Sequence, residues 1–279
     1  MIKKCFISGF PSAGKTTFLA ALMNLISADN SNSKLKLHKI NNLQYLMTLS
    51  EKWANMDPLE RTVPSNEHID IAINLELPNK EIVNFYLPDL SGETFQKLYE
   101  MREIPEELAN YIIEANTFLF FVNVKNVKEL GLISEHFKNQ ANETKENNLL
   151  KRNPTEHDPL QIQIIQLLQF FMLLRKNQKI KISFMFSAWD IMKTNCHNIK
   201  PDQFLKERMN MLWQYCSSNS DYIEFYTWGI SAQGGEFEQK DTLLDKEYPY
   251  QRIFVEGNDG YIGNDLTLPL YLLMGDLNE

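Results

Sequence analysis

The chain has 279 residues and a formal net charge of −8, from 28 Lys and Arg against 36 Asp and Glu. Its 43% hydrophobic and 23% charged residues supply a sizeable core and exclude a disordered, collagen-like or disulfide-rich chain. The negative charge opposes nucleic acid or an anionic membrane as a partner, and no segment has the ~20 apolar residues of a membrane span.

Apolar periodicity predicts strands that alternate with helices. We expect strands at 5–8, 69–77, 82–87, 118–124, 180–186 and 222–228. We expect a first helix whose apolar positions run from Phe18 to Ile26 and which ends before Asp29. Further helices are expected at 93–114 with a break near Pro105, 160–176 and 201–215, and there is room for one at 43–53. The segments 69–77 and 82–87 form a predicted hairpin, whereas 34–66 is interpreted as a connection outside the core. This alternation predicts an α/β fold with a mainly parallel sheet covered on both faces.

The length is interpreted as one domain, 1–279, with additions. Residues 125–159 break the rhythm with many Asn, Lys and Glu and are predicted to be an insertion. The chain after about 235 is a C-terminal extension, and its apolar run at 266–273 is expected to pack on the sheet. Three Cys without a C-x-x-C motif and an N-terminus without a signal-peptide core favour a cytoplasmic location.

The first chemical motif is GFPSAGKT, residues 9–16, which fits G-x-x-x-x-G-K-[ST] between the first strand and the first helix. The glycines permit a loop whose N–H groups face phosphate oxygens, while Lys15 would reach the terminal phosphates and the Thr16 hydroxyl would bind Mg²⁺. The candidate nucleotide-binding residues here are Gly9, Ser12, Ala13, Gly14, Lys15, Thr16 and Thr17.

A second motif separates the kinds of nucleotide-binding protein. Asp89 and Gly92 form a D-x-x-G that follows the strand at 82–87. Asp89 would hold the metal ion, and the Gly92 N–H would meet the terminal phosphate.

Two further segments follow the last two strands and predict base recognition. In Ser187-Ala188-Trp189-Asp190 the carboxylate would accept both N1–H and N2–H of guanine, a pair of donors that adenine lacks. Trp189 would either cover the base or, as we favour, pack against the following helix. The segment 229–234 would offer backbone N–H groups of Ser231 and Ala232 to the guanine O6.

These four loops, in this order, resemble the P-loop GTPases of the translation-factor-like (TRAFAC) class over about residues 1–235. The stretches GFPSAGKTTFLAAL, LPDLSGETF and FSAWD are similar to the bacterial double-GTPase group of predicted conflict and antiviral defence systems. The resemblance implies a three-layer P-loop NTPase fold, with a mainly parallel six-stranded sheet and one antiparallel hairpin strand. It also implies Mg²⁺, GTP and GDP as ligands, and a switch between two nucleotide-bound shapes.

The sequence departs from the class pattern in two places. Ser187 and Ala188 replace the Asn and Lys of N-K-x-D, which weakens the expected guanine selectivity. Glu93 replaces the glutamine that orients the attacking water, and its added negative charge predicts slow hydrolysis. The first switch should supply a metal-binding hydroxyl, for which Thr62 is first choice and Ser65 second. The resemblance thus implies catalytic roles for Lys15, Thr62, Gly92 and Glu93, and metal ligation by Thr16, Thr62 and Asp89.

Two other functions remain open. One is an ATPase or a nucleotide kinase, although a kinase should carry an arginine-bearing lid and 125–159 contains only Arg152. The other is an interaction module that binds GTP without turnover, favoured by Glu93 and the acidic charge. For the GTPase interpretation we expect guanine nucleotide and a protein effector as partners, and dimerisation is left open.

Overall fold

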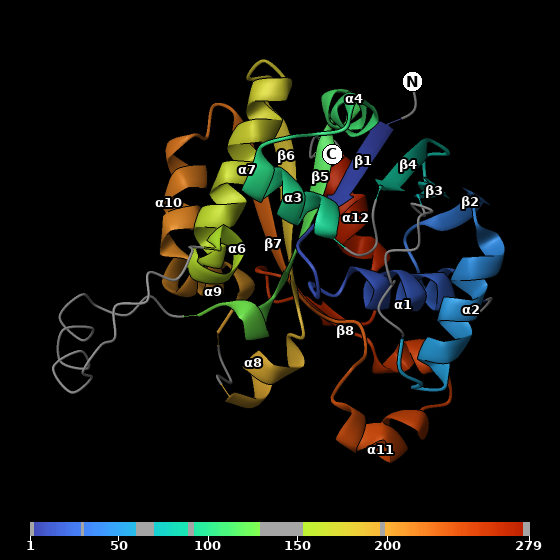
Figure 1. The fold of residues 1–279 in the computed structure, drawn as a ribbon. Coiled ribbons are helices and arrows are strands. Elements are labelled where there is room, and N and C mark those ends of the chain that lie inside the picture. The colour runs from blue at the N-terminus through green and yellow to red at the C-terminus, as the bar shows by residue number, and fades with distance from the viewer. Residues whose placement is uncertain are drawn as a thin grey trace, which may run out of the picture.

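A computed structural model describes residues 3–28, 31–59, 70–88, 92–128, 153–195 and 199–275. Its described strands form one nine-stranded mixed sheet in the order β2-β3-β4-β1-β5-β6-β7-β8-β9 (Figure 1). The strands are β1 (Lys3–Ser8), β2 (Lys36–Ile40), β3 (Ile71–Glu76), β4 (Ile82–Leu87), β5 (Thr117–Asn123), β6 (Ile180–Ser187), β7 (Ile223–Ser231), β8 (Phe254–Glu256) and β9 (Ile262–Gly263).

The centre of the sheet is parallel and its two edges are antiparallel. Strands β4, β1, β5, β6 and β7 pair in parallel, β2 and β3 extend one edge, and β8 and β9 extend the other. The α/β prediction and the hairpin of β3 and β4 are confirmed, but the six-stranded sheet is wrong. Strand β2 was missed because its side chains are mostly exposed, and β8 and β9 are too short to show a period.

Helices cover both faces of the sheet (Figure 1). The main helices are α1 (Lys15–Ser27), α2 (Leu43–Ala54), α3 (Glu93–Met101), α4 (Glu106–Glu114), α7 (Leu160–Leu174), α9 (Pro201–Arg208), α10 (Asn210–Ser218) and α12 (Thr267–Met274). One apolar cluster joins the sheet to α1, α2 and α12, and a second joins it to α3, α4, α7, α9 and α10. These clusters make the two interfaces of a three-layer arrangement.

The structure divides two of the helical segments expected from the sequence. The break near Pro105 is confirmed, since α3 ends at Met101 and α4 begins at Glu106. The single helix expected at 201–215 is wrong, because Met209 leaves helical geometry and separates α9 from α10. Burial of Leu270 and Leu273 in α12 confirms that the run at 266–273 packs on the sheet. None of the described helices is long and apolar enough to cross a membrane.

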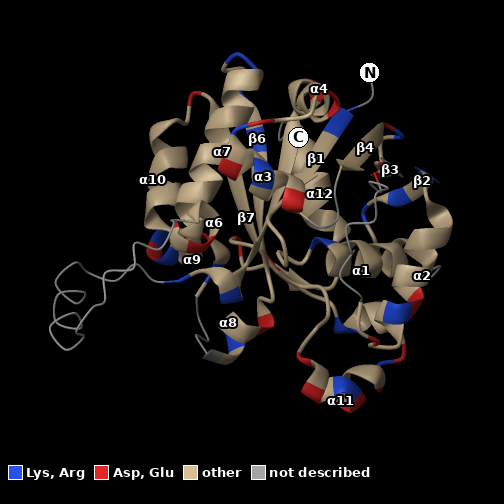
Figure 2. Ribbon diagram, viewed as in Figure 1, with Lys and Arg blue, Asp and Glu red and all other residues tan. Residues whose placement is uncertain are grey.

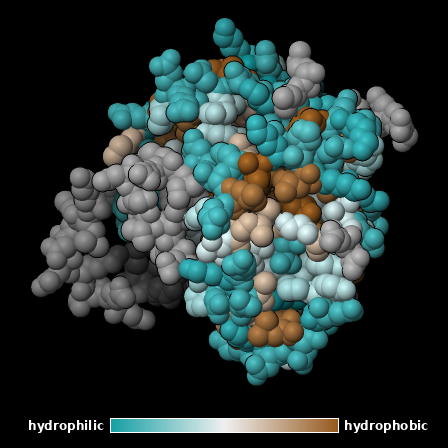
Figure 3. All heavy atoms as spheres, turned by 90° about the vertical axis from the view of Figure 1, so that its right-hand side faces the viewer, coloured by the Kyte–Doolittle hydropathy of each residue, from teal (hydrophilic) through white to brown (hydrophobic). Residues whose placement is uncertain are grey.

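The segment before the hairpin is part of the core, contrary to its interpretation as a connection. Leu35, Leu46 and Trp53 are fully buried, and the Trp53 indole donates to the carbonyl of Ala232, 3.2 Å away. Arg252 covers the Trp53 ring at 4.0 Å. The helical period of α2 was visible in the sequence, but its partners lie about 180 residues later. The face that carries α2 also shows apolar side chains at its surface (Figure 3).

Candidate functional site

The phosphate-binding loop joins β1 to α1. Helix α1 begins at Lys15, so its first N–H groups face the loop, where they favour an anion. Gly14 has φ +92°, and a Cβ there would lie 2.8 Å from Ser187 Oγ. Both the left-handed backbone and this close approach therefore require glycine. The motif assigned from the sequence has the strand-loop-helix setting that phosphate binding needs.

Lys15 is buried inside this loop, with 3% of its surface exposed. Its Nζ donates to the carbonyl oxygens of Gly9 at 2.7 Å and Phe10 at 3.0 Å. Gly92, with φ +79°, packs beside it, because a Cβ at Gly92 would lie 2.6 Å from Lys15 Nζ. The glycine of D-x-x-G and the lysine of the phosphate loop are thus neighbours in space.

Several expected site residues lie outside the described part of the chain. These are Asp89, Thr62 and the second choice Ser65. Thr16 is described and half-buried in the first turn of α1, and Glu93 is half-buried as the first residue of α3.

A pocket of about 530 Å³ opens beside the phosphate loop. The predicted nucleotide-binding residues that line it are Gly14, Thr17, Ser187, Asp190, Ser231 and Ala232. They come from α1 and its N-terminus, the end of β6, the start of α8 (Asp190–Asn195) and the end of β7. Charged residues of both signs lie on α8 and on α11 (Lys240–Leu244), and Figure 2 shows these two helices at the same end of the molecule.

Asp190 and Ser231 form the polar end of the pocket. The Ser231 hydroxyl donates to Asp190 Oδ1 at 2.5 Å and accepts from the Gly234 N–H at 3.2 Å. Asp190 is only half-buried and lines the pocket. Trp189 does not line the pocket: its ring is fully buried against Phe186 and Phe204.

Two side chains tie the phosphate loop to the neighbouring strand ends. Ser187 donates to the carbonyl of Ala13 at 2.8 Å, and Asn123 donates through Nδ2 to the carbonyl of Ser12 at 3.1 Å. Ser187 was expected in the site, but Asn123 was missed. Its only sequence signal is a polar residue near the end of the buried run at 118–124. Both bonds fix the loop on the carboxyl edge of the parallel sheet.

Lys125, also missed from the sequence, extends along the rim of the pocket. Its Nζ pairs with Glu236 Oε1 at 2.9 Å, and both side chains are more than half exposed. The hydrogen bond that Lys125 donates to Glu236 raises the pKa of Lys125, and the charges of Glu236 and Asp190 act in the same direction. Ala188 leaves the motif without its usual lysine, and Lys125 brings a lysine to the same pocket from the 3-10 turn that follows β5.

The comparisons with solved structures show weak likeness to three GTPase-related proteins. A signal recognition particle receptor SRb-GTP/SRX complex from Chaetomium thermophilum has TM-score 0.44 and 10% identity, over 87% of this chain and 96% of that one. The GTP-bound Ski7 GTPase-like domain from S. cerevisiae has TM-score 0.39 and 13% identity, over 84% of this chain and 44% of that one. The small GTPase Arl6 BBS3 from Trypanosoma brucei has TM-score 0.40 and 13% identity, over 88% of this chain and 95% of that one. At these values no ligand or activity is carried over.

No curated protein matches the sequence. The family described as Double-GTPase 1 matches residues 6–273, which include the phosphate loop, the D-x-x-G segment, Asp190 and the end of β7. That span is nearly the whole chain, and it agrees with the resemblance found from the motifs. The chain therefore belongs to the Double-GTPase 1 family.

Proposed function

We propose that this chain binds GTP together with Mg²⁺, hydrolyses it slowly and acts as a nucleotide-dependent switch. The observation that carries the proposal is that Gly14 of the phosphate loop lines the same pocket as Asp190 and Ser231, which are hydrogen-bonded to each other. Membership of a GTPase family supports a guanine nucleotide as the ligand.

Asp190 supplies the discrimination between bases. Its carboxylate would accept N1–H and N2–H of guanine, and the Ser231 hydroxyl already holds one of its oxygens. Adenine offers no matching pair of donors, so ATP would give the carboxylate no hydrogen-bond partner from the base. This chemistry favours GTP over the ATPase and nucleotide-kinase alternatives.

The phosphates would lie over the loop at the N-terminus of α1. The Lys15 ammonium would exchange its contacts with the Gly9 and Phe10 carbonyls for phosphate oxygens. Gly92, packed beside Lys15, is placed for its N–H to contact the terminal phosphate. We infer that residues 58–66 and 90–105 change order when that phosphate is lost.

The donor set suits Mg²⁺. Thr16 offers a hydroxyl oxygen in the first turn of α1, and Thr62 and Asp89 would add a hydroxyl and a carboxylate. Oxygen donors of this kind are those that Mg²⁺ prefers, usually beside substrate phosphates. When bound, the ion neutralises charge on the phosphates.

The hydrolysis step would be slow because Glu93 follows Gly92. A carboxylate at that position orients water but adds negative charge near a transition state that is already strongly negative. An effector protein would then read the GTP-bound shape. A place in a bacterial conflict or antiviral defence system rests on the likeness of the motifs to that group.

Calorimetry with GTP, GDP and ATP on the chain and on Lys15→Ala tests the binding proposal. We expect GTP to bind more tightly than ATP, and Lys15→Ala to lose most of the affinity. Lys36→Ala, at an exposed position on β2, is the matched control and should bind as the parent does. Tighter binding of ATP than of GTP would contradict the guanine assignment.

Phosphate release from GTP, followed with and without candidate partner proteins, tests turnover. Slow release supports the GTPase proposal. Retained GTP binding with no release under any condition would instead identify an interaction module.

A further inference from the structure

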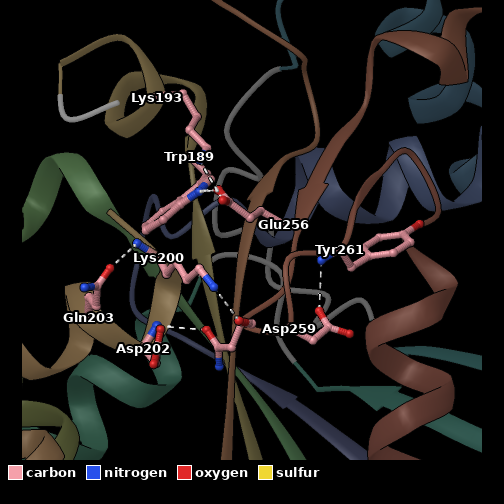
Figure 4. A network of polar contacts seen from close by, with 9 residues as sticks. Trp189, Lys193, Lys200, Asp202, Gln203, Glu256, Asp259 and Tyr261 are labelled. Atoms are coloured by element: carbon pink, nitrogen blue, oxygen red, sulfur yellow. Dashed lines mark hydrogen bonds and ion pairs between the residues drawn. The ribbon is translucent and has the colours of Figure 1, made fainter. Parts of the chain in front are cut away.

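Trp189, the residue before Asp190, is fully buried in the core, and Figure 4 shows its indole beside Glu256. Its indole lies against β7 at Gly229, where a Cβ would come within 2.4 Å of the ring. Phe204 of α9 contacts the ring edge-on, with centroids 5.5 Å apart. Because Asp190 is the next residue in the chain, the packing of this indole restricts where the Asp190 backbone can lie.

The other side of the indole meets a buried carboxylate from the C-terminal extension. Glu256, the last residue of β8, is 5% exposed. Its Oε2 accepts from Trp189 Nε1 at 2.6 Å, and its Oε1 accepts from Lys193 Nζ at 2.6 Å (Figure 4). A carboxylate buried to this degree is costly unless both oxygens have partners. Its two partners flank Asp190, one residue before it and three after it.

The turn after β8 adds a second attachment on the far side of α8. The Asn258 carbonyl accepts from Lys200 Nζ at 3.0 Å, and Asn258 Oδ1 accepts from the Asp202 N–H at 3.0 Å (Figure 4). Asn258 Nδ2 donates to Thr227 Oγ1 at 2.7 Å, which anchors the turn on β7. The β8–β9 hairpin is thus hydrogen-bonded to the chain both before and after the six residues of α8.

We propose that Glu256 is a positioning residue for base recognition, an inference that rests on Asp190 reading guanine. A helix of six residues has little stability of its own, so α8 takes its orientation from tertiary contacts. A bidentate pair requires both carboxylate oxygens to face the base within a narrow range of angles. By fixing Trp189 and Lys193, Glu256 fixes the carboxylate between them. The C-terminal extension is then a working part of the nucleotide site.

Glu256→Gln tests the proposal with little change in shape. Trp189 and Lys193 donate to separate oxygens of Glu256, whereas glutamine in the same position would present an N–H₂ group to one of these donors. The matched control is Glu224→Gln near the start of β7, at the opposite end of the sheet from the pocket. Glu224 also accepts from two donors, Tyr226 and Lys179. Trp189→Phe is a second test variant, because it keeps an aromatic ring and removes the N–H.

The readout is the ratio of affinities for GTP and for ITP, whose hypoxanthine base lacks the N2 amine. Guanine can form both hydrogen bonds of the bidentate pair and hypoxanthine only one. We therefore expect Glu256→Gln and Trp189→Phe to weaken GTP binding about three- to tenfold. ITP binding should weaken less, so the ratio of GTP affinity to ITP affinity falls. Glu224→Gln should keep the parental ratio. Thermal unfolding measured alongside separates a general loss of stability from this change.

Two outcomes are distinguishable failures. If the parent chain binds GTP and both test variants keep its ratio of GTP to ITP affinity, whatever their melting temperature, the positioning role of Glu256 is wrong. If the parent chain itself does not bind GTP, the proposed function fails, and the inference fails with it.

Discussion

Ser187 donates a hydrogen bond across 2.8 Å to the carbonyl of Ala13, a residue 174 positions earlier in the chain. The bond joins the phosphate-binding loop to the segment that ends in Asp190. Gly14 has no side chain at the point where Ser187 packs, so the two segments approach closely. The serine that interrupts the N-K-x-D pattern therefore connects residues 9–16 to the segment that carries Asp190, and both segments line one pocket.

Ser187→Ala should weaken GTP binding about two- to tenfold, since one hydrogen bond contributes about 0.5–1.5 kcal/mol. Ser183→Ala is the control: it removes from the same strand a buried hydroxyl that donates to Met185 Sδ at 3.4 Å. Fluorescence titration with a labelled GTP measures both. Equal affinities in the two variants would show that the Ser187 bond does not support the site.

Gly92→Ala should lower the rate of GTP hydrolysis about tenfold or more, because the added methyl group would collide with Lys15 Nζ. Gly260→Ala separates this collision from backbone strain. Gly260 has a similar φ of +91°, and nothing lies within 4 Å of its Cβ position. The control should lose about 1 kcal/mol of stability and keep the parental rate. A parental rate in Gly92→Ala would mean that Gly92 is not close to the reacting phosphate.

Glu93→Gln should raise the rate of hydrolysis about three- to tenfold, since it removes a negative charge near the transition state and keeps groups that orient water. Glu107→Gln, an exposed acid in the first turn of α4, controls for the change in net charge. Single-turnover phosphate release gives both rates. A slower Glu93→Gln variant would instead indicate that the carboxylate takes part in the reaction as a base.

Lys125 should contribute to GTP binding mainly through its aliphatic stem. Lys125→Ala is expected to weaken binding about three- to tenfold, and Lys125→Met, which keeps the stem, by less than about twofold. The melting temperature should hardly change, because the ion pair with Glu236 is more than half exposed and such pairs contribute about 0–1 kcal/mol. Equal losses in the two variants would assign the effect to the charge.

The sequence predicted the parts of the site that depend on local patterns. Gly14, Ser187 and Asp190 stand at the ends of recognisable strands or at the start of a helix, and the structure brings them to one pocket. Asn123 and Glu256 act through partners more than 60 residues away, so no local period reveals them. The edge strands were missed for a different reason: β2 is mostly exposed, and β8 and β9 have only three and two residues.

The most direct test of guanine recognition is an exchange of base preference in Asp190→Asn. Asparagine presents one acceptor and one donor, which match N1–H and the C2 carbonyl of xanthine, whereas aspartate matches the two donors of guanine. Calorimetry with GTP and XTP should show that the parent chain prefers GTP and that Asp190→Asn prefers XTP. A variant that keeps the parental preference for GTP over XTP would contradict the assignment of Asp190 as the residue that reads the base.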